Sequence, residues 1–226
     1  MSLLIAIINV NFLEVIMLTF YINDEIDFEK IRKYTNKEKA FRIIIKNDIA
    51  FSKEFKPIDN LFDYNIYIDG RNHTLSNIEI NDIDERIGLF KKVGNLYVKN
   101  LNINNSHLYG GVLSGIICGD VEHETKLNNI NLENVIVSSE AYGGGVVGYS
   151  ETLSIKNSKI NTEVHGFDVV GGVVGMTNEY LEVNCDIDSV LYSVGKCYGN
   201  NAGYCERKRI NPISKQMKRF RGFHLL

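Results

Sequence analysis

Two short segments concentrate the side chains that could do acid–base or metal chemistry. Each contains three acids beside a basic residue. Their members are Asp82, Asp84, Glu85 and Arg86 in the first segment and Asp120, Glu122, His123 and Glu124 in the second. Carboxylate oxygens are ligands that Ca²⁺ prefers. Both segments fall between repeated strands, where loops gather solvated polar residues, so we predict no metal site and no cofactor.

No pattern in the chain indicates a catalytic nucleophile with its base. The five histidines are scattered without an HExxH motif. Ser114 and Ser150 lie near glycines, but neither belongs to a GxSxG turn. Glycosidases need two carboxylates at a set separation, which a sequence does not give. We therefore predict no catalytic residues, and keep a carbohydrate-active enzyme as the alternative.

A glycine-rich stretch offers a different chemistry, phosphate binding. Gly143, Gly145 and Gly148 match the spacing of the dinucleotide fingerprint. That motif must connect a strand to a helix, whereas residues 149–155 read as a turn followed by a strand. The motif also returns 27 residues later, which a single cofactor site does not require. We interpret these glycines as structural.

Repetition organises the chain from about residue 75 onwards. The stretch Gly-Gly-Val-Val-Gly occurs at 144–148 and 171–175, and an eroded copy surrounds Gly203. A second pattern places Asn between apolar residues, and its copies begin 23, 29 and 28 residues apart. In a fifth copy Cys185 takes the Asn place. The residues assigned to the structural repeat are Asn77, Asn100, Asn129, Asn157, Gly144, Gly145, Gly148, Gly171, Gly172 and Gly175.

These intervals suit one coil of a parallel β-helix, an all-β solenoid. Successive coils stack at about 4.8 Å, so that equivalent side chains lie above one another. Apolar residues then fill the core, and an Asn at an inward turn position can bond its neighbours above and below. The glycines allow the close approach of backbone at a corner.

The repeats resemble those of the GLUG-motif proteins, which are bacterial cell-surface and adhesin-like proteins. The resemblance rests on Gly144–Gly148 and Gly171–Gly175, each beside an Ile-x-Asn strand such as 155–157. It covers about residues 20–204, with Val where Leu is common in the family. It implies a right-handed parallel β-helix attached to larger surface proteins, and it brings no catalytic residues.

The ends of the chain differ from the repeats. Residues 1–20 are apolar but lack the basic start of a signal peptide, and Met17 is an alternative start. No membrane span is predicted. Residues 206–226 carry a net charge of +6, which leaves −9 on the remainder. Such a tail can contact nucleic acid, but a solvated end is the preferred interpretation.

Residues 21–60 are predicted to form a short capping helix and the first strands, ahead of β-helix coils over 61–205. Asp24 can cap a helix over residues 24–35, and Ile26, Phe28, Ile31 and Tyr34 can form its apolar stripe. None of the four cysteines belongs to a CxxC motif. A disulfide among Cys185, Cys197 and Cys205 is possible on spacing, and buried free thiols are favoured.

Together these patterns favour a non-enzymatic surface-binding solenoid, adhesin-like and located at a cell surface or on a virion. Exposed asparagines and a stack of Tyr109, Tyr142 and Tyr149 are expected to offer a lateral face to a glycan or a protein. The alternative is a polysaccharide lyase, hydrolase or phage-tail depolymerase on the same fold. Such an enzyme is expected to have a lateral groove that holds two or more acids within reach of an Arg or Lys. A decayed gene is the third reading, suggested by the eroded last repeat.

Overall fold

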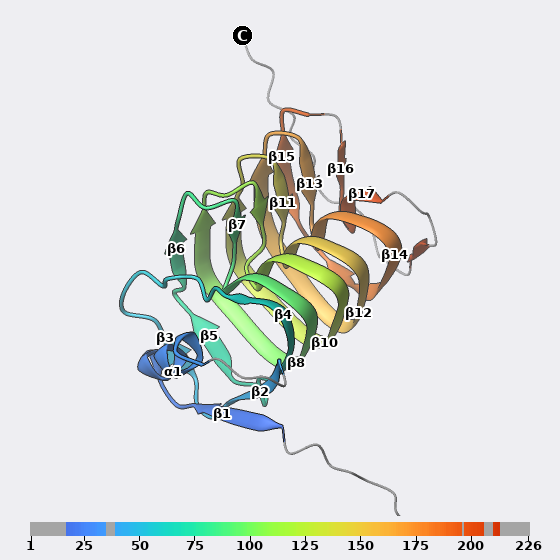
Figure 1. Cartoon of the computed structure of the whole chain (residues 1–226). Coiled ribbons are helices and arrows are strands. Elements are labelled where there is room, and N and C mark those ends of the chain that lie inside the picture. The colour runs from blue at the N-terminus through green and yellow to red at the C-terminus, as the bar shows by residue number, and fades with distance from the viewer. Residues whose placement is uncertain (1–16, 35–38, 196, 206–209, 213–226) are drawn as a thin grey trace, which may run out of the picture.

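The chain folds as a right-handed parallel β-helix of about six turns, as predicted, with one short helix near its N-terminal end. The computed structural model describes residues 17–34, 39–195, 197–205 and 210–212. Most of the predicted apolar segment 1–20 and of the predicted basic tail 206–226 lies outside the described residues. Figure 1 shows the coils rising along one axis from β1 to β14.

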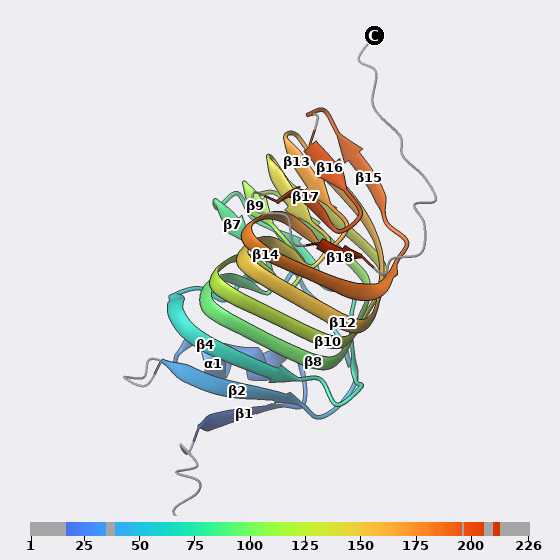
Figure 2. The same cartoon turned by 90° about the vertical axis from the view of Figure 1, so that its right-hand side faces the viewer.

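Two sheets form the walls of the coil, and all described pairings between their strands are parallel. The larger sheet consists of β1 (Leu18–Ile22), β2 (Ala40–Ile45), β3 (Ile49–Ala50), β4 (Leu61–Asp69), β5 (Thr74–Ser76), β6 (Glu79–Asn81), β8 (Phe90–Tyr109), β10 (Cys118–Ser138), β12 (Val147–Gly166), β14 (Val174–Ile187), β15 (Val190–Ser193), β17 (Ala202–Cys205) and β18 (Ile210–Pro212). The smaller sheet consists of β7 (Arg86–Ile87), β9 (Leu113–Ser114), β11 (Tyr142–Gly144), β13 (Val169–Gly171) and β16 (Cys197–Gly199). The long strands β8, β10 and β12 bend around corners and so contribute to more than one face (Figure 2).

The strand register sets the length of one coil. Cys118 pairs with Phe90 before it and with Val147 after it, and Val147 pairs with Val174. One turn therefore takes 27 to 29 residues in this part of the chain. The eroded last repeat keeps this register, because Val174 pairs with Ala202 and Gly203 consequently lies beside Gly175.

Vertical columns of aliphatic side chains fill the core. One such column consists of Ile68, Val98, Leu127, Ile155 and Val183. None of its members is more than 5% exposed. Burial of each stabilises the fold by roughly 1.5–3 kcal/mol. The buried hydroxyls of Thr125 and Ser150 also point inward and bond each other at 2.8 Å, which satisfies two polar groups inside this core.

The predicted helix is present but shorter, as a 3₁₀ turn η1 (Glu25–Asp27) that continues into α1 (Phe28–Arg32). The Asp24 carboxylate caps it as predicted, by accepting the N–H groups of Ile26 and Asp27. The predicted apolar stripe is wrong at Ile26, which is 70% exposed. The tighter winding of a 3₁₀ turn rotates this residue away from the buried face. Thr35, the predicted last residue, lies outside the described residues.

The helix lies at the N-terminal end of the stack (Figure 1). Its Phe28 ring packs against Phe51 and Phe55, with ring centroids 5.7 and 5.5 Å apart. β1 pairs with β2, and β2 pairs with β4, so these first strands already belong to the larger sheet. No helix in the described part of the chain is both long and apolar enough to cross a bilayer.

The cap predicts a pH dependence of stability through Asp27. The Lys30 ammonium and the N–H groups of Asn23 hold the pKa of this carboxyl at about 2. Because this folded-state value lies below that of the unfolded chain, the carboxylate stabilises the fold above about pH 4. That stability is lost as the pH falls toward 2.

Asp27→Asn should therefore lower the free energy of unfolding by about 1–2 kcal/mol at pH 7, and by progressively less as the pH falls to 3. Urea titrations across this range measure the difference. Glu29→Gln, an exposed neighbour on the same helix, is the matched control. A deficit for Asp27→Asn that is the same at pH 7 and pH 3 would contradict the assignment.

Candidate functional site

The repeated asparagines lie at two outer corners of the coil. Their φ angles lie between 46° and 64°, in the left-handed region that asparagine tolerates better than most other residues. The first corner holds Asn72, Asn100, Asn129 and Asn157, and the second holds Asn77, Asn105 and Asn134. Each corner thus repeats one conformational requirement, coil after coil.

The predicted alignment of Asn77 with Asn100 is wrong. Leu75 pairs with Ile103, which places Asn77 beside Asn105, and Asn72 takes the place beside Asn100. The two corners need the same kind of residue, so both produce an apolar-x-Asn pattern. The 23-residue interval from Asn77 to Asn100 therefore connects two different corners and is not the length of one coil.

The inward placement expected for these amides is also wrong. The residue after each Asn points inward instead, and these residues are Ile78, Leu101, Ile130 and Ser158. The amides bond one another outside: Asn129 Nδ2 donates to Asn100 Oδ1 at 2.9 Å and to Asn72 Oδ1 at 3.0 Å. They form a surface ladder that fixes the corner.

Cys185 occupies a shorter version of the first corner. Lys156 pairs with Asn184 and Lys159 with Asp186, so one residue spans the corner that two residues span in the coil before. Cys185 is buried there and free, and burial raises its pKa to about 12. Cys118 and Cys197 are free as well, whereas the Cys205 side chain lies outside the described residues.

The glycines of the repeat lie where neighbouring backbone comes closest. In all six, a Cβ atom would stand 1.9 to 2.7 Å from a backbone atom. These six are Gly144, Gly145, Gly148, Gly171, Gly172 and Gly175. Each glycine-rich segment leads into a strand and not into a helix: β12 follows β11, and β14 follows β13. The structural interpretation of the glycine-rich stretch therefore accounts for its geometry.

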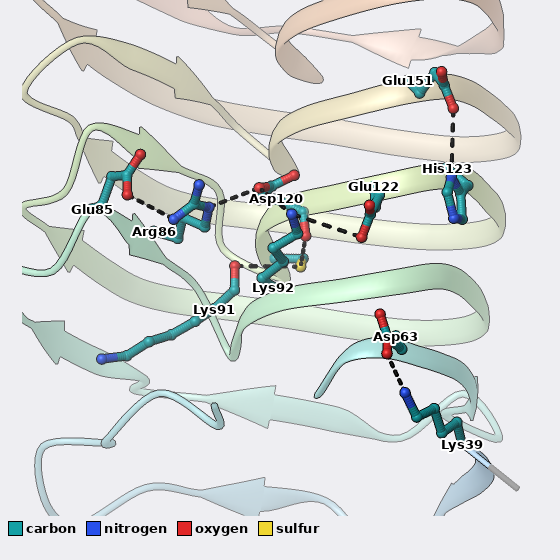
Figure 3. Close-up of polar contacts among 11 residues, drawn as sticks. Lys39, Asp63, Glu85, Arg86, Lys91, Lys92, Asp120, Glu122, His123 and Glu151 are labelled. Carbon is teal, nitrogen blue, oxygen red and sulfur yellow. Dashed lines mark hydrogen bonds and ion pairs between the residues drawn. The ribbon is translucent and has the colours of Figure 1, made fainter. Parts of the chain in front are cut away.

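Acids of both segments take part in an ion-pair cluster rather than standing as free carboxylates, and Figure 3 shows its centre at Arg86, Lys92 and Asp120. Asp120 accepts a hydrogen bond from Arg86 Nε at 2.7 Å, and Lys92 Nζ lies 3.7 Å from both Asp120 and Glu122. Arg86 also contacts Glu85 at 2.7 Å. Although burial lowers the pKa of the Arg86 guanidinium, these acids raise it above its ordinary value. In the same neighbourhood Lys91 pairs with Asp82 and Asp84.

The predicted solvated loop is wrong for the second segment, which lies inside β10, with Asp120 only 5% exposed. Its members also separate: His123 pairs with Glu151, and Glu124 accepts from Lys126 and from the Tyr97 hydroxyl. Among the described residues, no group of three or more His, Cys, Asp or Glu is arranged to hold a metal ion. The three basic side chains of the cluster thus hold five acids of the two segments in ion pairs.

A groove of about 670 Å³ runs across β2, β4, β8, β10 and β12 on the lateral face seen in Figure 2. Two outward columns build it. The first contains Arg42, Tyr67, Tyr97, Lys126 and Ser154, and the second contains Ile44, Asp69, Lys99, Asn128 and Lys156. Arg71 adds a fifth cation at the turn after β4. The cations outnumber the acids of the lining by five to one.

A pair of tyrosines stands at the centre of this groove. Tyr67 and Tyr97 stack with centroids 4.8 Å apart and planes 16° from parallel. Lys126 Nζ lies 5.6 Å from the Tyr97 centroid, over the other face of that ring. Burial and a hydrogen bond to Glu124 raise the pKa of Tyr97 to about 12, so the phenol keeps its proton at neutral pH.

The cations of the groove differ in how firmly they are held. Lys99 pairs with Asp69 at 3.3 Å, Lys126 with Glu124 at 2.7 Å and Lys156 with Glu182 at 3.0 Å. These half-exposed pairs are each worth about 0–1 kcal/mol, so an anion can compete for them. No ion pair joins Arg42 or Arg71 to another residue in the described part of the chain.

The predicted stack of Tyr109, Tyr142 and Tyr149 is wrong. The three tyrosines belong to three different columns, since Tyr109 pairs with Ser138, Tyr142 with Leu113 and Tyr149 with Asp120. The groove tyrosines went unnoticed because Tyr67 precedes the repeats and Tyr97 lies just outside the repeated pattern that begins at Val98. Their 30-residue separation, close to one coil, and their outward parity were the signals that could have found them.

No protein-family model, curated protein or solved structure matches this chain. The resemblance to the GLUG-motif proteins is therefore still a prediction. The functional argument has to rest on the groove itself.

The asparagine corners predict a difference between two substitutions at one position. Asn129→Ala should lower the free energy of unfolding by about 1–2 kcal/mol, because alanine is strained in the left-handed region. Asn129→Gly loses the same side-chain hydrogen bonds without that strain and should cost clearly less. Chemical denaturation measures both, and an equal loss would contradict the conformational explanation.

Adjacent glycines give a second matched pair. A Cβ at Gly144 would stand 1.9 Å from the Val147 carbonyl oxygen, whereas at Gly143 it would first meet a Val164 side-chain carbon at 3.0 Å. Gly144→Ala should therefore destabilise by about 3 kcal/mol or more, and Gly143→Ala by about 1 kcal/mol. Thermal and urea unfolding distinguish them. Similar losses in both variants would show that close backbone approach is not the constraint.

Proposed function

We propose that this chain is a non-enzymatic solenoid that binds an acidic glycan along its lateral groove. The observation that carries the proposal is the set of five cations arranged around the stacked pair of Tyr67 and Tyr97. Each of five successive coils contributes one of these cations, and neighbouring coils are about 4.8 Å apart. An extended chain of uronic acids carries one carboxylate on every sugar, so a chain lying across several coils can bring more than one carboxylate to these cations.

The ring geometry favours a glycan over a single-stranded nucleic acid. Binding of unpaired bases relies on open aromatic faces. Here Tyr67 and Tyr97 cover one face of each other, and Lys126 covers the second face of Tyr97. Stacking is therefore limited to the second face of Tyr67, which suits a single sugar ring better than a run of bases, while the Tyr67 hydroxyl can bond a sugar hydroxyl.

Asp69 is the single acid among the described residues that line the groove, and the adjoining Glu124 and Glu182 are ion-paired with Lys126 and Lys156, so the groove offers no free pair of carboxylates for a glycosidase. Burial raises the pKa of Asp69, but the Arg71 backbone N–H, the Asn100 amide and the Lys99 ammonium together bring it below its usual value. Asp69 therefore stays ionised near neutral pH and is a poor proton donor. This supports binding without cleavage.

An adhesin-like role at a cell surface or on a virion is part of this proposal. It is supported by the repeat resemblance and by a long lateral face that a polymer can follow. In such a role, modest affinity per site is enough when many copies act together.

Titration calorimetry with a hexamer of galacturonic acid tests the groove. The wild-type chain should bind it, more weakly as the NaCl concentration rises. Arg42→Glu combined with Arg71→Glu should weaken binding about tenfold or more. Lys159→Glu, an exposed lysine outside the groove, is the matched control and should change affinity less than about twofold.

Absence of binding by the wild-type chain, or wild-type affinity in the double variant, would overturn the proposal. Release of shorter oligosaccharides during incubation would overturn its non-enzymatic part. In that event loss of cleavage in Asp120→Asn would favour the enzymatic alternative at the ion-pair cluster.

A further inference from the structure

A further outward column, on another edge of the solenoid, has aromatic rings on both sides of one coil position, or rung, that lacks a ring. Strand pairing aligns Asn81, Tyr109, Ser138, His165 and Tyr192 on successive coils, at the ends of β6, β8, β10, β12 and β15. Tyr109 therefore lies one coil before Ser138, and His165 lies one coil after it. The serine leaves the space of a side chain between two aromatic residues.

The two rings on the C-terminal side of this rung are held in place. His165 and Tyr192 stack with centroids 4.5 Å apart and planes 16° from parallel. His165 Nε2 also lies 2.7 Å from Glu163 Oε1, which fixes the rotation of the imidazole. Because Tyr192 covers one face of His165, the other face is directed toward the Ser138 rung.

A cavity of about 380 Å³ occupies this place and includes Tyr109, Ser138 and His165 in its lining. A small residue follows each of the last four members of the column, and we call these small residues the floor of the cavity. These floor residues are Gly110, Ser139, Gly166 and Ser193. Phe167 and Val194 also line the cavity, and Glu140 adds a carboxylate. Tyr109 is 67% and Phe167 60% exposed, so the cavity has unusually open aromatic walls.

The spacing of the coils indicates what fits. Two coil steps separate Tyr109 from His165, or about 9.6 Å. A flat aromatic ring fits this space, because Tyr67 and Tyr97 already stack one coil step apart at 4.8 Å. A pyranose chair fits it too, and its C–H face packs on aromatic side chains while its hydroxyls bond polar groups such as Ser138 and Glu140, which an apolar ring would leave without partners.

We infer that the rung at Ser138 is a binding site for one pyranose unit of a neutral glycan, held between Tyr109 and His165. Glu140 and Glu163 make the surroundings acidic, which disfavours a uronic acid and separates this specificity from that of the basic groove. The two cavities share no lining residue, so this inference does not rest on the proposed function.

Saturation-transfer NMR with the methyl glycosides of glucose, galactose, mannose and N-acetylglucosamine tests the site. At least one of them should receive saturation from the wild-type chain, at millimolar concentration. Tyr109→Ala should weaken that binding about tenfold. Tyr180→Ala, an exposed tyrosine on another face, is the matched control and should leave it unchanged.

Ser138→Phe supplies the missing ring and gives the sharpest test. It should abolish glycoside binding while the melting temperature stays equal or rises, because the new ring stacks on His165. A loss of binding in this variant then reports a filled site and not an unfolded chain.

Three results would overturn the inference. The first is no saturation of any of the four glycosides by the wild-type chain. The second is glycoside binding that survives in Ser138→Phe. The third is tighter binding of N-acetyltyrosine amide than of every glycoside, with the same dependence on Tyr109, which would assign the rung to an aromatic side chain of a protein partner.

Discussion

The parallel hydrogen bonding of each coil to the next is the constraint on which the rest of this molecule depends. It fixes the separation of coils at about 4.8 Å and their register at 27 to 29 residues per turn. Once the register is set, every side chain has a neighbour above and below. Aliphatic columns then build the core, asparagine columns build the corners, and glycine columns allow backbone to pass close to backbone.

The same constraint creates the surface sites. On the lateral face it stacks Tyr67 on Tyr97 and places cations on neighbouring coils, which concentrates positive charge on a chain that is otherwise acidic. On another edge it stacks His165 on Tyr192 and leaves a gap at Ser138. Neither site needs a dedicated loop or insertion. Both follow mainly from which residues stand at equivalent outward positions of successive coils.

Sequence reasoning predicted the parts of the structure that repeat in the core. The spacing of the glycine-rich segments and apolar strands predicted the length of one coil, and stacked coils of that length predicted a parallel β-helix. It failed at Asn77, because two corners with the same left-handed requirement produce the same local pattern. It also missed the burial of Asp120, which depends on Arg86, a residue of the preceding coil 34 positions away. The site tyrosines were missed because their contact exists only once the register of β4 and β8 is known.

The central claim is that stacked coils present a cation-lined groove to an acidic glycan. A crystal structure of the chain with a hexamer of galacturonic acid tests it most directly. The account predicts the oligosaccharide along the Tyr67–Tyr97 pair, with carboxylates beside Arg42, Arg71 and Lys126. An oligosaccharide ordered only elsewhere on the solenoid, or cleaved beside Asp120 and Arg86, would contradict it.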